Sequence, residues 1–141
     1  MKTFDLTVSR VIPAPPTDVY DVWIDPKSPG GLWYGVAHLI LNPVVDGLFY
    51  HAVDHEGRRW PHYGRFIRLE RGRAIEHTWV SEGTKGIESI VTITFAARDA
   101  GTEVTLHHAN VPDDQLGRQH QSGWSWYLDV LAKRFEKVAA R

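Results

Sequence analysis

The sequence predicts an α+β domain in which a curved antiparallel sheet of six to seven strands wraps around one long C-terminal α-helix. Segments of alternating polarity, separated by turn sequences, fill residues 36–109. The last quarter of the chain instead repeats its apolar residues with the period of an α-helix. The chain has 141 residues and no internal repeat or linker, so we expect one domain over residues 1–141, with two short helices after the first strand.

The N-terminal elements are marked by an alternating segment followed by prolines. Residues 3–12 alternate in polarity, which predicts a half-buried strand that the next three prolines end. Thr17 and Asp18 are expected to cap a short helix that stops before Pro26. Residues 27–35 are rich in glycine and proline, and they predict an irregular turn or a single helical turn, the second short helix.

The middle of the chain predicts six consecutive antiparallel strands, because each alternating run is bounded by turn residues. These strands are residues 36–42, 47–54, 59–70, 73–81, 87–98 and 102–109. The final helix is predicted over about 114–139, since Trp124, Leu128, Leu131 and Phe135 recur on one of its faces. The apolar face of the sheet is expected to pack on this helix, with a space left between them for a small molecule.

Turn lengths predict which side chains face each other across the concave side of the sheet. A hairpin that pairs Asp54 with Arg59 places His51 directly opposite His62. A second hairpin sets His108 against Val91, and the strand before it brings His77 to the other side of Val91. Alternation then predicts an inward set of Phe49, His51, Val53, Ile75, His77, Trp79, Val91, Ile93, Phe95, Val104, Leu106 and His108.

The strand at 59–70 allows two orientations, because Gly64 is a candidate β-bulge. One orientation turns His62 and Phe66 inward, and the other turns Tyr63 and Ile67 inward. The sequence leaves both open.

Composition excludes several classes of protein. The chain has no cysteine, so disulfide scaffolds, cysteine-ligated metal centres and thiol nucleophiles are excluded. Its net charge is −1 at pH 7, which gives no global attraction to nucleic acid. No segment reads as a membrane span or a signal core, so we expect a cytoplasmic protein that does not insert into a membrane.

Several ordered motifs resemble a known family. They include Trp23 with Asp25-Pro26, Trp33-Tyr34-Gly35, Tyr63-Gly64-Arg65-Phe66, and Gly123-Trp124 with Leu128. In this order the chain resembles bacterial proteins related to the activator of the 90-kDa heat-shock-protein ATPase, within the START-related, polyketide-cyclase-like superfamily. Asp46 departs from the glycine pair that the family often has before the third strand. The resemblance implies a helix-grip fold with a ligand cavity under the C-terminal helix, and it implies no particular reaction.

The inward histidines are the candidate chemical groups, and three interpretations of them stay open. They are polar liners bonded to neighbouring groups, or they bind an organic ligand, or they chelate a metal. We expect no metal site, because no carboxylate converges on them and no helix carries two histidines four residues apart with a third ligand. No cofactor is expected. His120 and Tyr127 share a helix edge with Trp124 and are further candidates for the rim of the cavity.

The function predicted from the sequence is binding of a hydrophobic small molecule, lipid-like or aromatic. The expected ligand-binding residues are His51, His77, Trp79, Val91, Ile93, Phe95, Leu106, His108, Trp124, Tyr127 and Leu131. Two alternatives remain, a module that activates a chaperone ATPase and a cyclase or hydrolase that uses His77 and His108. No serine-nucleophile elbow or phosphate loop is present, so we assign no catalytic residue and favour a protein that is not an enzyme. Homodimerisation is left open.

Overall fold

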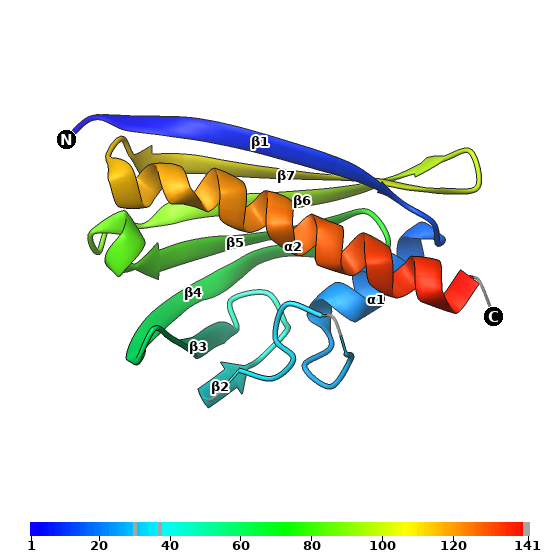
Figure 1. Ribbon diagram of the computed structural model, residues 1–141, viewed down its shortest axis with the longest axis horizontal. Coiled ribbons are helices and arrows are strands. Elements are labelled where there is room, and N and C mark those ends of the chain that lie inside the picture. Colours follow the sequence, from blue (N-terminus) through cyan, green and yellow to red (C-terminus); the bar gives the residue numbers. More distant parts are fainter. Residues whose placement is uncertain (30, 37, 140–141) are drawn as a thin grey trace.

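The structure is a computed structural model that describes residues 1–29, 31–36 and 38–139 (Figure 1). These residues form seven strands, β1 (Thr3–Ile12), β2 (His38–Leu41), β3 (Leu48–His55), β4 (Arg58–Glu70), β5 (Ala74–Ser81), β6 (Ser89–Arg98) and β7 (Gly101–Pro112). They also form two α-helices, α1 (Pro16–Ile24) and α2 (Gln115–Ala139), and the 3-10 turn η1 (Glu82–Thr84). The strands make one antiparallel sheet in the order β1-β7-β6-β5-β4-β3-β2, which confirms the predicted α+β fold.

Helix α1 begins one residue earlier than the sequence suggested. Pro16 occupies its first turn and Pro15 its N-cap, with no side-chain cap, so the predicted capping role of Thr17 and Asp18 is wrong. Proline at the start of a helix costs nothing, because the missing N–H would have no partner there. The helix ends at Ile24 before Pro26, as predicted.

The second short helix after β1 does not form in the described residues. Within residues 25–29 and 31–34 the backbone instead makes hydrogen-bonded turns, such as Gly31 N–H to the Ser28 carbonyl at 2.9 Å. The glycines and prolines of this segment interrupt helical hydrogen bonding. The strand predicted over 36–42 shortens to β2, and its position 37, like position 30 of the turn, lies outside the described residues.

The predicted registers of the sheet are confirmed. Asp54 pairs with Arg59, which places His51 opposite His62. In the next hairpin Val91 pairs with His108 on one side and with His77 on the other. Strand β7 extends to Pro112, three residues beyond its predicted end.

Strand β4 turns His62 and Phe66 toward the concave side and leaves Tyr63 half-exposed. The register shift lies between Phe66 and Arg68, so the candidate bulge at Gly64 is wrong. Gly64 serves another purpose, because a Cβ there would lie 2.6 Å from the Phe49 ring and 2.1 Å from the Thr78 carbonyl. The absent side chain lets Phe49 lie flat over β4.

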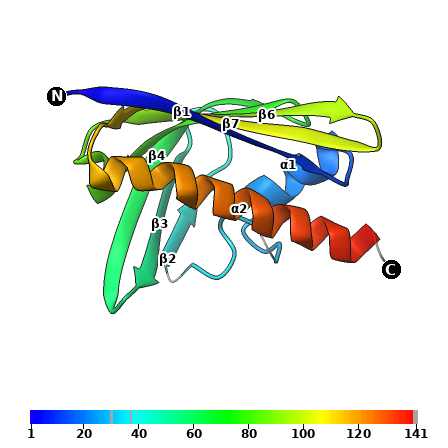
Figure 2. The same cartoon turned by 45° about the horizontal axis from the view of Figure 1, so that its top comes forward.

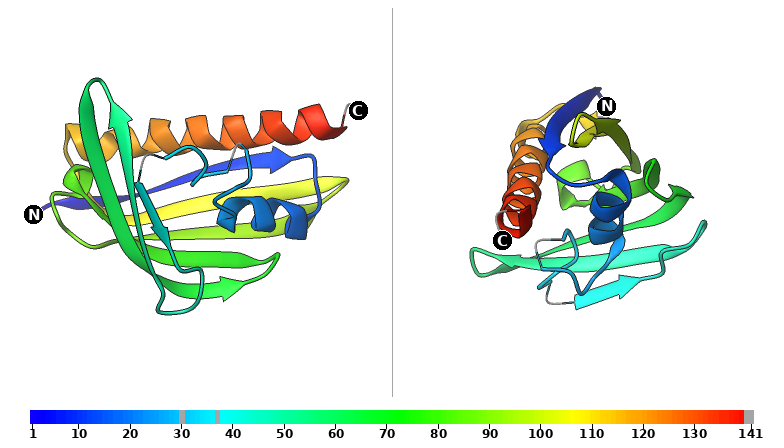
Figure 3. Two further views of the ribbon diagram at one scale, coloured as in Figure 1. Left: turned by 90° about the horizontal axis from the view of Figure 1, so that it is seen from below. Right: turned by 90° about the vertical axis from the view of Figure 1, so that its right-hand side faces the viewer.

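Both helices lie on the concave side, within the curve of the sheet (Figure 3). The Asp114 side chain accepts a hydrogen bond from the Gly117 N–H at 2.7 Å and so caps α2. Helix α2 packs against β1 and β7, and Arg10 of β1 pairs with Asp129 on it. Helix α1 lies beside the C-terminal half of α2, whereas β3 and β4 cross the N-terminal half of α2 (Figures 2 and 3).

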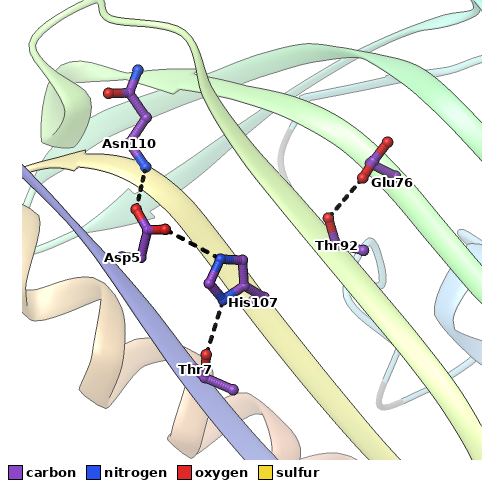
Figure 4. Close-up of polar contacts among 6 residues, drawn as sticks. All are labelled: Asp5, Thr7, Glu76, Thr92, His107 and Asn110. Carbon is purple, nitrogen blue, oxygen red and sulfur yellow. Dashed lines mark hydrogen bonds and ion pairs between the residues drawn. The ribbon is translucent and has the colours of Figure 1, made fainter.

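The convex face of the sheet is polar and solvated. His107 of β7 shares a hydrogen bond with Thr7 of β1 at 2.9 Å and lies 3.4 Å from the Asp5 carboxylate (Figure 4). On the same face Thr92 donates to Glu76 at 2.9 Å. One apolar and one polar face is the usual division for an antiparallel sheet packed on one side only.

Candidate ligand pocket

A pocket of about 460 Å³ lies between the N-terminal half of α2 and the strands β3, β4 and β5. Most of the side chains that line it are aromatic rings, imidazoles or aliphatic groups. The lining consists of Leu32, His51, Val53, His55, Trp60, His62, Trp79, Ser81, Gly83, Leu116, Gln119, His120, Gly123, Trp124, Trp126 and Tyr127. Trp126, with 67% of its surface exposed, stands at the mouth. We call this region the pocket half of the concave face.

Four of the eleven predicted ligand-binding residues line the pocket. His51 comes from β3 and Trp79 from β5, while Trp124 and Tyr127 come from one edge of α2. Each has at most 6% of its surface exposed, so these four form the floor of the pocket. His120, expected at the rim beside Trp124, also lines it.

The other seven predicted residues do not line the pocket. They are His77, Val91, Ile93, Phe95, Leu106, His108 and Leu131, and each has at most 5% of its surface exposed. Helix α1 covers Phe95, since its Tyr20 and Trp23 rings lie with centroids 5.5 and 6.3 Å from that ring. The His120 and Trp124 rings of α2 cover His108, at 5.0 and 6.2 Å. Trp23 also touches Tyr127 at 5.0 Å and so closes this side of the pocket. We call the region formed by Val91, Ile93, Phe95, Leu106, His108 and Leu131 the filled half.

His51 and His62 form a stacked pair on the sheet side of the pocket. Their ring centroids are 4.7 Å apart and their planes differ by 18°, as expected for directly opposed cross-strand residues. Trp79 lies against both rings, at 5.6 and 4.9 Å. The Nδ1 atom of each imidazole is buried and has no hydrogen-bond partner among the described residues. The Nε2 atoms are therefore the ring nitrogens that a ligand in the pocket can contact.

A chain of buried hydrogen bonds fixes the two tryptophans of the floor. The Trp124 indole donates to His108 Nδ1 at 3.1 Å, so the neutral His108 ring carries its proton on Nε2. That nitrogen then donates to Ser89 Oγ at 2.7 Å. Ser89 in turn donates to the Trp79 carbonyl at 2.6 Å. His108 thus links helix α2 to strands β5 and β6 from behind the pocket.

Four histidines of the concave face, His51, His62, His77 and His108, are uncharged at neutral pH. Burial lowers the pKa of His51 to about 3, and neighbouring His62 and His77 add to the effect. Burial also lowers the pKa of His62 to about 4, with His120 nearby. The same cause brings the pKa of His77 to about 4 and that of His108 to about 2. Desolvation favours the neutral ring, because removing an imidazolium from water is costly.

Tyr127 completes the floor with a phenol that stays protonated. Its hydroxyl approaches the backbone of Leu32 without reaching hydrogen-bond geometry, and burial raises its pKa above the usual range. Nearby, the Trp60 and Trp79 indole nitrogens are also buried without a partner. Such unpaired polar atoms are uncommon in folded proteins, and with the Nδ1 atoms of His51 and His62 five of them belong to residues of this pocket.

Sequence reasoning missed part of the lining for identifiable reasons. His62 was one of two alternatives, and the confirmed register with His51 was the signal that could have selected it. Trp60 follows from His62 by the two-residue period of a strand. Leu32 and Trp126 had no such signal, because an irregular segment positions the first and the second stands on an exposed part of α2.

Metal binding and membrane crossing find no support in the residues described. No group of three or more histidine, aspartate or glutamate side chains in this part of the chain is arranged to hold a metal ion. Over the same residues, no helix is both long enough and apolar enough to span a bilayer.

A curved antiparallel sheet that grips a long C-terminal helix defines the helix-grip class of α+β proteins. A family profile described as "Activator of Hsp90 ATPase homolog 1-like protein" matches residues 13–136, and the chain belongs to this family. The resemblance drawn from its motifs is thereby confirmed. A search of curated proteins found no match.

Solved structures share the fold. Protein CV1439 from Chromobacterium violaceum is 24% identical, with a TM-score of 0.79 over 94% of this chain and 98% of that one. CalU16 from Micromonospora echinospora is also 24% identical, with a TM-score of 0.69 over 90% and 73% of the two chains. SA2116 from Staphylococcus aureus, a protein of unknown function, is 11% identical with a TM-score of 0.78 over 99% and 98%. At these identities the likeness establishes the architecture alone.

Proposed function

We propose that the protein binds a hydrophobic, aromatic small molecule in the pocket half of the concave face. The observation that carries this proposal is the aromatic lining of a cavity of about 460 Å³, a volume within the range of small-molecule sites. Four of the six tryptophans of the chain line it, and indole rings offer large, rigid contact surfaces to a planar ligand.

The size of the pocket favours a compact ring system over a long acyl chain. Trp23 of α1 packs against Tyr127 at 5.0 Å and so closes the pocket toward the C-terminal half of α2, among the residues that the structure describes. Of the two ligand types expected from the sequence, lipid-like and aromatic, the second fits this enclosure better.

Binding is also better supported than catalysis. His77 and His108, the two proposed acid–base residues, are fully buried behind the pocket and engaged with other groups. His51 and His62, which do line it, have pKa values of about 3 and about 4 and are weak bases at pH 7. The family description also names a chaperone ATPase, and an ATPase assay with that chaperone tests this alternative.

The proposal is tested by a substitution that places a side chain in the pocket, at a position with room for one. Gly123 of α2 lines the pocket, and a Cβ placed there meets no atom within 4 Å. We expect Gly123→Met to abolish quenching or enhancement of tryptophan fluorescence by naphthalene-sized aromatic probes. The variant should remain folded, since replacing a mid-helix glycine stabilises a helix by about 0.5–1 kcal/mol.

Gln121→Met is the matched control, because Gln121 is exposed on the same helix and does not line the pocket. It should bind the probes as the unmodified protein does. Equal binding by the unmodified protein and Gly123→Met would place the ligand elsewhere and overturn the proposal, as would a lack of response to every aromatic probe.

A further inference from the structure

Among the residues that the structure describes, the pocket lining contains no aspartate, glutamate, lysine or arginine, so it offers no carboxylate, ammonium or guanidinium partner to a ligand. Arg58 is a cation close to this lining, but its guanidinium lies over the Trp60 ring at 4.2 Å and pairs with Glu82. A charged ligand would therefore lose its hydration without gaining an ionic partner from the pocket wall.

The stacked histidines act as hydrogen-bond donors. A buried N–H without a partner is rarer in proteins than an unpaired acceptor. The buried, unpartnered Nδ1 atoms of His51 and His62 are thus assigned as the unprotonated nitrogens. Each neutral ring then carries its proton on Nε2, the nitrogen available to a ligand.

His120 offers the opposite role. Its Nδ1 lies 2.9 Å from the Gly117 carbonyl, which can only accept, so Nδ1 carries the proton. Its Nε2 is left as an acceptor on the helix side, and the edge of this ring faces Gly83 in the lining. His120 is close enough to His62 to contribute to the low pKa of that residue. The pocket therefore presents donors on β3 and β4 and an acceptor on α2.

We propose that the ligand is an uncharged phenol whose hydroxyl accepts from Nε2–H of His62 or His51 and donates to Nε2 of His120. A hydroxyl is the one small group that accepts and donates at the same atom. The aromatic ring of the ligand lies against Trp79 and Trp124, whose own centroids are 5.2 Å apart. This inference rests on the proposed aromatic-binding function.

Three probes of one shape separate the possibilities: naphthalene, 2-naphthol and 2-naphthoate. Each is titrated into the full chain at pH 7, with affinity measured from the indole N–H signals in ¹H–¹⁵N spectra. We expect 2-naphthol to bind about tenfold more tightly than naphthalene, since each net hydrogen bond contributes three- to tenfold, roughly. We expect 2-naphthoate to bind most weakly of the three.

The variant His62→Phe keeps a ring in the stack and removes both nitrogens. It should reduce the advantage of 2-naphthol over naphthalene to about threefold or less, with both affinities measured in the same variant. His107→Phe is the matched control, because His107 lies on the convex face outside the pocket and its replacement should leave all three affinities unchanged.

The outcomes distinguish failure of the phenol inference from failure of the proposed aromatic-binding function. If naphthalene binds and 2-naphthol binds no more tightly, or if 2-naphthoate binds best, the phenol inference is wrong and aromatic binding stands. If none of the three binds, both fail. The ligand series in the unmodified protein decides between these results even if His62→Phe does not fold.

Discussion

The filled half and the pocket half of the concave face differ in what covers them, although strand alternation supplies inward side chains to both. In front of the filled half, Tyr20 and Trp23 of α1 reach Phe95, and the side chains behind them are at most 5% exposed. The pocket half has no such plug. It keeps histidines and tryptophans whose polar atoms lack partners. The residues that cover each part of the face thus decide which part becomes core, with α1 covering Phe95 and the Trp124 and His120 rings of α2 covering His108.

Acid is expected to have the largest effect on the free energy of unfolding, because buried neutral histidines lie in both halves. His51, His62, His77 and His108 have folded pKa values of about 3, 4, 4 and 2, below the value near 6.5 of an unfolded chain. As pH falls below about 6.5, the unfolded state takes up protons that the folded state cannot. Stability is therefore full above pH 6.5 and decreases below it, until the folded pKa values are reached.

The expected loss is about 1.4 kcal/mol per pH unit for each histidine, or about 5–6 kcal/mol per unit for the four together. Urea unfolding at pH 6 and pH 5 measures it. His77→Phe should reduce the slope by about a quarter. A stability that varies by less than about 1 kcal/mol over this pH unit would contradict the buried neutral assignment.

The two halves should differ sharply in their tolerance of truncation. Ile93 in the filled half has no exposed surface, and Ile93→Ala should lower the free energy of unfolding by about 2–5 kcal/mol through lost burial and a residual cavity. Val53 lines the pocket with 37% of its surface exposed, and Val53→Ala should cost less than about 1 kcal/mol. Chemical denaturation at pH 7.5 compares the two variants. Equal costs would mean that the pocket half is packed as tightly as the filled half.

Much of the site's framework was readable from the sequence, because turn lengths fix strand register. The prediction that His51 faces His62 required only the hairpin that pairs Asp54 with Arg59. The row through His77, Val91 and His108 followed in the same way. Alternation identifies the face of a sheet to which a side chain belongs, since successive residues point to opposite sides.

Alternation does not identify what lies in front of that face, and here sequence reasoning stopped. His77 and His108 share a face with His51, yet only His51 lines the pocket. The difference comes from contacts distant in sequence, such as Trp124 of α2 against His108 and Phe49 of β3 against His77. Those contacts depend on how α2 and β3 pack onto the sheet, which local propensity does not encode.

The smallest expected difference concerns two adjacent histidines of β7 that lie on opposite faces. His108 is buried, and its Nε2–H donates to Ser89, whereas His107 shares its hydrogen bond with Thr7 on the solvated convex face (Figure 4). Ser89→Ala leaves a buried N–H without an acceptor and should cost about 1–3 kcal/mol. Thr7→Ala removes the corresponding partner of His107 and should cost no more than about 0.5 kcal/mol, since water replaces it.

Urea unfolding of the two variants measures both costs, and the Trp124 indole signal reports the chain of hydrogen bonds directly. In Ser89→Ala the His108 proton has no acceptor on Nε2, so the ring is driven toward the other tautomer and away from its bond with Trp124. We expect faster hydrogen exchange at the Trp124 indole in this variant and no change in Thr7→Ala. Unchanged exchange in Ser89→Ala would mean that packing alone fixes Trp124, and that the pocket floor owes nothing to the polar chain behind it.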